Sequence, residues 1–120
     1  MIVGMKSEAF RAFLSNQREA YRKISKVYCR VLNSFISFNS EGFRHLTHNG
    51  LGKSRNHGDT ARRFHLFPRA VSIIREASEI SKHTFIGTIE YWRLEKGKTA
   101  VILRKVGNGH IHFYSIMDKR

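Results

Sequence analysis

The segment HIHFYSIM, residues 110–117, contains side chains that could do acid–base chemistry. Its alternation predicts a β-strand in which His110, His112 and Tyr114 share one face and apolar residues occupy the other. An imidazole can exchange a proton near neutral pH, and a tyrosine ring can stack on a nucleic-acid base. The pattern therefore indicates a chemical role for this strand.

A cation is expected opposite His112. A three-residue loop, Gly107–Gly109, would pair Arg104 with His112, whereas a two-residue loop would place Lys105 there instead. RNA can be cut without a metal if a base activates its 2′-OH, an acid protonates the leaving oxygen and a cation stabilises the phosphoryl charge. His45, in GFRHL, could complete this set with His112 and Arg104.

The preceding hairpin extends the same face. If Lys96–Gly97 is a two-residue loop, Arg93 pairs with Ala100 and Tyr91 with Ile102. The polar face then consists of Tyr91, Arg93, Arg104, His112 and Tyr114, and the apolar face of Trp92, Leu94, Val101, Leu103, Ile111 and Phe113. Rings and guanidinium groups on an open sheet face are typical of single-stranded RNA binding.

Helices are predicted before this sheet. Apolar residues at three- and four-residue steps predict a helix from Ser7 to about Leu32, followed by a short strand at 35–38 and a turn at 39–42. An exposed cationic loop is expected at 49–59, and Asp59 or Thr60 can cap a second helix.

Pro68 lies within that second helix and should kink it or divide it in two. Three strands should follow, at 84–94, 98–106 and 110–117. Helices first and a meander last predict an α+β fold in which N-terminal helices pack on a curved antiparallel sheet. We expect one domain over 1–120, with an N-terminal helix at 1–32.

Charge points to the class of partner. The chain has 22 Lys and Arg against 9 Asp and Glu, a net charge of +13, which is typical of proteins that bind a polyanion. No apolar run is long enough to span a membrane, and the first residues lack a secretory signal pattern, so we expect a cytoplasmic protein or one delivered to the cytoplasm. Cys29 is alone, and no pattern completes a zinc site around His45 and His48, so we expect no metal and no cofactor.

The motifs GFRHLTHNG, ARRFHLFPRAVSII, IEYWRL, AVILRK and HIHFYSIM occur in an order that resembles the barnase–EndoU–colicin–RelE group of ribonucleases, over residues 34–117. These are small RNA-cutting domains, many of them toxins of phages and mobile elements. The resemblance implies site roles for His45, Arg63, Arg104, His112 and Ser115. In the register above Ser115 lies on the apolar face, so its role requires a bulged strand or a site on the other face of the sheet.

The hypothesis that best fits these features is a metal-independent endoribonuclease toxin acting on tRNA, mRNA or ribosome-associated RNA. An active ribonuclease would need an acidic antitoxin or immunity protein to cover its basic site. The residues expected to bind RNA are Arg55, Arg62, Arg63, Tyr91, Lys105 and Tyr114. The alternative is a non-catalytic RNA-binding module; a DNA-binding role is disfavoured because no groove-reading motif is present.

Overall fold

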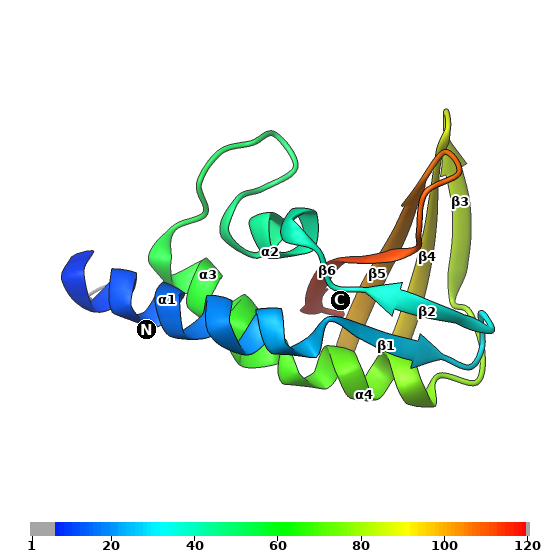
Figure 1. Ribbon diagram of the computed structural model, residues 1–120, viewed down its shortest axis with the longest axis horizontal. Helices are drawn as coiled ribbons and strands as arrows, with labels where there is room; N and C mark the ends of the chain where they lie inside the picture. The colour runs from blue at the N-terminus through cyan, green and yellow to red at the C-terminus, as the bar shows by residue number, and fades with distance from the viewer. Residues whose placement is uncertain (1–6, 120) are drawn as a thin grey trace.

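The computed structural model describes residues 7–119 and contains a six-stranded sheet that is curled into a half-barrel (Figure 1). The strand order is β1-β2-β6-β5-β4-β3, and every neighbouring pair is antiparallel except β2–β6. The elements are α1 (Ser7–Ile24), β1 (Lys26–Cys29), β2 (Ser34–Ser37), α2 (Ser40–Thr47), α3 (His57–Leu66), α4 (Pro68–Glu76), β3 (Lys82–Ile86), β4 (Ile89–Lys96), β5 (Thr99–Val106) and β6 (His112–Asp118). The predicted α+β class, with helices first and the meander last, is confirmed.

The predicted helix over 7–32 is wrong beyond Ile24. Ser25 adopts a left-handed φ of 60°, the conformation that commonly ends a helix, and the chain continues as strand β1. Val27 and Cys29 are buried in alternation with exposed neighbours, as a half-buried strand requires. Asn33, at φ 50°, then reverses the chain into β2.

A helix replaces the turn predicted at 39–42. Asn39 caps α2, because its side-chain oxygen accepts a hydrogen bond from the Gly42 amide at 3.1 Å. A Cβ at Gly42 would lie 2.4 Å from the Phe113 carbonyl oxygen, so this glycine lets α2 approach β6 closely. Asn56 caps α3, which therefore begins before Asp59.

Pro68 divides the second predicted helix into α3 and α4, one of the two outcomes expected for it. The helix α4 ends at Glu76, and Ile80, which lies beyond it, is exposed. The helix cap and Pro68 act locally in the sequence. The residue at which α4 ends depends instead on the tertiary contacts of that helix.

The C-terminal meander has four strands rather than three, because Gly87, at φ 62°, splits the predicted strand 84–94 into β3 and β4. The predicted pairing of β4 with β5 is also wrong: Arg93 lies opposite Ile102 and Tyr91 opposite Arg104. The error is two residues, and side chains alternate with a period of two, so the assignment of residues to faces survives it.

The last hairpin contains a bulge that rearranges the predicted faces. Arg104 lies opposite His112 as predicted, but Ile102 lies opposite Ser115 instead of Tyr114. Tyr114 is the extra residue in β6, and the bulge turns Ser115 to the face that carries Arg104 and His112. The expectation that Ser115 faces the apolar core is therefore corrected, and the bulged alternative is the one observed.

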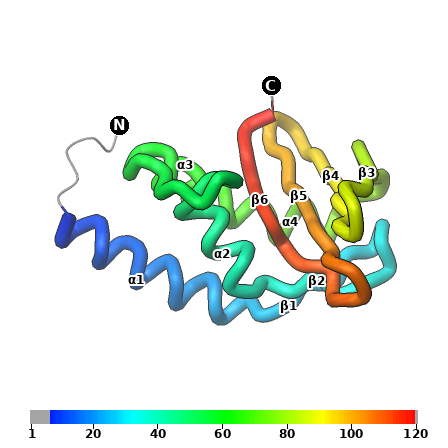
Figure 2. Tube along the Cα trace, turned by 90° about the horizontal axis from the view of Figure 1, so that it is seen from above, coloured from blue at the N-terminus to red at the C-terminus, as the bar shows by residue number. Residues whose placement is uncertain are grey.

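Helices cover two parts of the sheet. In Figure 2, α2 and α3 lie beside β6, while α4 lies across the sheet on the far side of the strands. The core between α4 and the sheet includes Phe38, Phe67 and Phe113, whose rings are within 5.8 Å of one another, and Tyr21 of α1 packs on all three.

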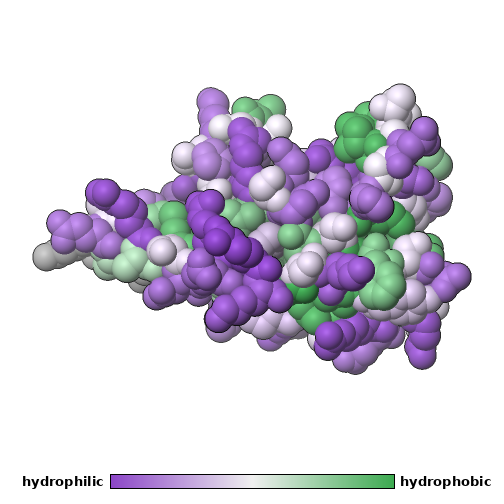
Figure 3. Space-filling view, viewed as in Figure 1, coloured by the Kyte–Doolittle hydropathy of each residue, from purple (hydrophilic) through white to green (hydrophobic). Residues whose placement is uncertain are grey.

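Hydrophilic side chains cover most of the face shown in Figure 3, with hydrophobic ones over β1–β2 and at the tips of the outer hairpins. The exposed large apolar side chains in these regions are Tyr28, Phe35, Phe85, Ile86 and Val106. None of the helices in the described part of the chain is long and apolar enough to cross a membrane.

Candidate functional site

The predicted site residues come together where β2 separates from β6. β2 pairs with β6 at a single position, Ser37 opposite His112, and then leaves the sheet toward α2. The remaining edge of β6 lies against α2 and α3 (Figure 2). Side chains from α2, α3, β4, β5 and β6 can therefore converge along β6.

His112 lies at this point of separation and is only 6% exposed. The Nε of Arg104 donates a hydrogen bond to His112 Nε2 at 3.2 Å, and because a guanidinium has no acceptor, this nitrogen carries no proton. Burial, and then the charge of Arg104, lower the pKa of His112, while the His110 backbone and Glu41 oppose the shift. His112 is therefore a neutral imidazole whose Nε2 can accept a proton.

His45 reaches the same place from α2. Its ring lies 4.2 Å from the Tyr114 ring, between centroids, and Arg55 Nη2 lies 3.5 Å from its Nδ1. Burial lowers the pKa of His45 to about 4, helped by the charges of Arg55, Arg63 and Arg104. Since Nδ1 faces a donor, the proton of the neutral ring resides on Nε2.

Two more arginines are fixed behind the imidazoles. Arg55, whose side chain is 8% exposed, donates from Nε to the His45 carbonyl oxygen at 3.0 Å and from Nη1 to Asp59 at 3.1 Å. Arg63 donates from Nη1 to Ser115 Oγ at 3.2 Å and to the Ile116 carbonyl oxygen at 2.8 Å. These bonds hold both guanidinium groups against the floor of the site.

The site carries more positive than negative charge. The Arg63 Nε atom is buried and lies 3.5 Å from Asp59 Oδ1, but it has no hydrogen-bond partner among residues 7–119. Glu41, which is half exposed, lies 3.6 Å from Arg104 Nη2. Three arginines thus share two carboxylates, Asp59 and Glu41, and this arrangement favours a bound anion.

The aromatic residues predicted to hold bases belong to the same cluster. The Arg104 guanidinium lies over the Tyr114 ring, 4.3 Å from its centroid, and Tyr91 approaches Tyr114 edge-on at 6.0 Å. Alternation along β6 predicted Tyr114 on the face of Arg104, and the ring lies there.

Two predicted RNA-binding residues lie elsewhere. Arg62 forms a bidentate ion pair with Asp118 at 2.8 and 3.1 Å, away from the imidazoles. Lys105 follows Arg104 in β5 and lines a hollow whose lining includes neither His45 nor His112. The structure thus brings together His45, Arg55, Arg63, Tyr91, Arg104, His112, Tyr114 and Ser115 from the predicted set.

Sequence reasoning missed Glu41 and Asp59 as members of the site. A signal for Glu41 existed: with Asn39 as a helix cap, Glu41 and His45 fall four residues apart on one helix face. The same spacing relates Asp59 to both Arg55 and Arg63.

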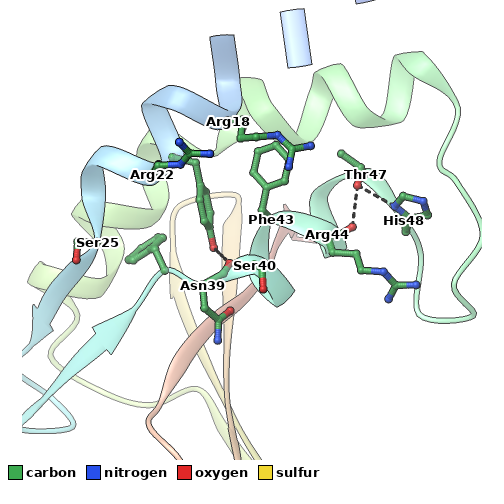
Figure 4. A pocket seen from close by; sticks show the side chains of 11 residues that line it. Arg18, Arg22, Ser25, Asn39, Ser40, Phe43, Arg44, Thr47 and His48 are labelled. Carbon is green, nitrogen blue, oxygen red and sulfur yellow. Dashed lines mark hydrogen bonds between the residues drawn. The ribbon is translucent and has the colours of Figure 1, made fainter. Parts of the chain in front are cut away.

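A second cationic cleft lies between α1 and α2 (Figure 4). Arg18, Arg22 and Arg44 surround it, and Arg18 lies over the Phe43 ring at 4.7 Å. Arg44 and His45 are neighbours on α2, and only Arg44 lines the cleft. The helix therefore separates this cleft from the imidazole site.

In the described range, 7–119, no group of three or more His, Cys, Asp or Glu side chains is arranged to hold a metal ion. Comparisons with models of known protein families, with curated proteins and with solved structures find no match. The resemblance to the ribonuclease group thus stays a prediction.

Proposed function

We propose that the protein is an endoribonuclease that cleaves single-stranded RNA by attack of a 2′-OH on the adjacent phosphate. The observation that carries the proposal is a pair of neutral imidazoles, the buried His112 and the half-buried His45, in a cluster of three arginines. A non-catalytic binder has use for the arginines but not for two imidazoles held in defined tautomers.

We assign the role of proton acceptor to His112. Its Nε2 is unprotonated and directed at Arg104, so a phosphodiester bound to Arg104 would bring its neighbouring 2′-OH to this nitrogen. The 2′ oxygen then bonds to phosphorus, its proton passes to His112, and the bond from phosphorus to the 5′ oxygen breaks. The products are a cyclic phosphate and a 5′-OH, and Arg104 stabilises the charge that develops on the phosphoryl oxygens.

His45 is assigned as the proton donor to the leaving 5′ oxygen. A bound phosphate offsets the arginine charges that, after burial, lower the pKa of His45, so in this mechanism the pKa of His45 rises on substrate binding and the ring takes up from water the proton that it then donates. Arg55 then turns from Nδ1 to the phosphate. The two histidines thus differ in the ring nitrogen that faces an arginine. In His112 it is Nε2, which accepts the proton, and in His45 it is Nδ1, which leaves the proton on Nε2 for donation.

The test is incubation of the purified protein with RNA in EDTA, followed by mapping of the RNA ends. Wild type should leave cyclic phosphate and 5′-OH ends, and His112→Gln, which keeps an acceptor for Arg104, should cleave about 10²–10⁴-fold more slowly with RNA affinity retained. His65→Ala, an exposed histidine outside the site, is the matched control and should cleave like wild type. Equal cleavage by His112→Gln and wild type would eliminate the mechanism, and RNA binding without any cleavage would favour the alternative of a binding module.

As a toxin of the cytoplasm, the enzyme would require an inhibitor in its host. A net charge of +13 and a site with three arginines favour an acidic partner, because complementary charge speeds association. Expression of the wild type alone should arrest growth, whereas His112→Gln should not. Normal growth with active wild-type enzyme would contradict the toxin role but not the ribonuclease activity.

A further inference from the structure

A hollow beside His112 has the composition of a nucleotide-binding subsite. It lies where the β1–β2 hairpin meets the β5–β6 turn, and its volume of about 570 Å³ is within the range of small-ligand pockets. Lys26, Phe35 and Ser37 line one side, and Lys105 and His110 line the other. None of the described residues that line it is acidic.

The sheet register places this hollow next to the imidazole site. Ser37 lies opposite His112 in the parallel pair and opposite Lys26 in the hairpin, so the three side chains share one face. Phe35 lies two residues before Ser37 on that same face. The strand geometry puts the Phe35 and His112 Cα atoms roughly 8 Å apart, two residues along and one strand across.

An exposed aromatic ring is available there. The Phe35 side chain is 55% exposed, and its ring contacts Tyr28 edge-on at 5.2 Å. The Lys26 ammonium lies over one face of the Phe35 ring, 4.7 Å from its centroid, so a base would stack on the other face. Neither Lys26 nor Lys105 forms an ion pair within the part of the chain that the structure describes. A flat ring bordered by unpaired cations is how proteins bind single-stranded nucleic acid: the ring stacks on a base and the cations hold phosphates.

We propose that this hollow binds the base of the nucleotide that supplies the 2′-OH, on the 5′ side of the cut. The inference rests on the proposed function, in which His112 accepts the 2′-OH proton. Along β6 the hollow comes first, then His112 with Arg104, and then Tyr114 with His45. The base of the attacking nucleotide therefore lies on Phe35, and the leaving nucleotide extends toward His45.

Binding is measured with a single-stranded 2′-O-methyl hexauridine, which cannot be cleaved by this chemistry. Phe35→Ala should weaken its Kd by roughly 5- to 150-fold, the range for loss of one stacked base, with the salt dependence unchanged. Lys105→Gln should instead flatten the salt dependence by about one counterion. Phe85→Ala, another exposed phenylalanine but on edge strand β3, is the control and should bind like wild type. Wild-type Kd in Phe35→Ala would overturn the proposal.

Phe35→Trp gives a second readout that keeps the ring. The only native tryptophan, Trp92, is buried, so emission from residue 35 should be quenched when the hexauridine is added, with the parent protein as control. If the emission does not change when the RNA is added but does change with protein concentration, a second copy of the chain covers the hollow, and the proposal is overturned.

The two proposals can fail separately. If wild type does not cleave RNA but Phe35→Ala still weakens the Kd, the ribonuclease mechanism fails and the hollow remains a base-binding site. If wild type cleaves RNA and Phe35→Ala binds and cleaves equally well, the subsite fails alone. To test its position, an abasic nucleotide on the 5′ side of the mapped cut should lower kcat/KM in wild type but add little to the defect of Phe35→Ala. If the abasic substrate lowers kcat/KM of Phe35→Ala by the same factor as that of wild type, the assignment of the base to this hollow is refuted.

Discussion

Lowering the pH from 7 to 5 should destabilise the fold by about 2 kcal/mol through His45 alone. The imidazole has an ordinary pKa of 6.5 in the unfolded chain, and burial with three nearby arginines lowers this pKa to about 4 in the folded protein. At a pH between the two pKa values, 6.5 and about 4, the unfolded chain binds a proton that the native state does not. The contribution of His45 to the free energy of unfolding is therefore complete above pH 6.5 and decreases as the pH falls toward 4. The shift of about 2.5 units corresponds to a total of about 3 kcal/mol, of which most is lost by pH 5.

Denaturant unfolding at a series of pH values measures this loss. His45→Gln fills a similar space and cannot titrate, so the difference between wild type and variant isolates His45 from His112 and from the carboxylates. The gap between the two stability curves should change by about 2 kcal/mol between pH 7 and pH 5, with wild type losing stability more steeply. Parallel curves over this interval would refute the placement of His45 among Arg55, Arg63 and Arg104.

Further predictions concern the reaction, the packing of α2 and the basic surface. In a pH–rate profile, the cleavage rate should rise with pH and reach half of its maximum below pH 6.5, because the lowered pKa of His112 leaves this imidazole unprotonated. A half-maximal rate above pH 6.5 would contradict this prediction. Gly42→Ala should destabilise the fold by roughly 1–3 kcal/mol, since its Cβ would strike β6, whereas Gly50→Ala, with nothing within 4 Å of the added atom, should change little in denaturant unfolding. Arg63→Gln should reduce the salt slope of RNA binding by about one, because Arg63 shares Asp59 with Arg55. Arg62→Gln should reduce the slope less, because Arg62 makes two hydrogen bonds to Asp118; equal slopes for the two variants would contradict this difference.

Local signals in the sequence predicted much of the fold. The alternating C-terminal segments, the division at Pro68 and the order of helices before strands are set by neighbouring residues, and all are observed. The cation opposite His112 was predictable because a short hairpin loop permits only two registers. A two-residue error between β4 and β5 left every side chain on its predicted face, which is why the polar face could be assigned despite a wrong pairing.

Tertiary contacts decided the remainder. Residues 26–29 fit a helical period as well as a strand, and only pairing with β2 selects the strand. The bulge that brings Ser115 to the site adds one residue to β6, which no local pattern specifies. Arg62 and Arg63 are adjacent in the sequence, yet one pairs with Asp118 at the surface and the other is buried against Ser115. Composition alone predicts a basic protein, but the low pKa of His45 depends on where the loop before α3, α3 itself and β5 place three guanidinium groups around one half-buried ring.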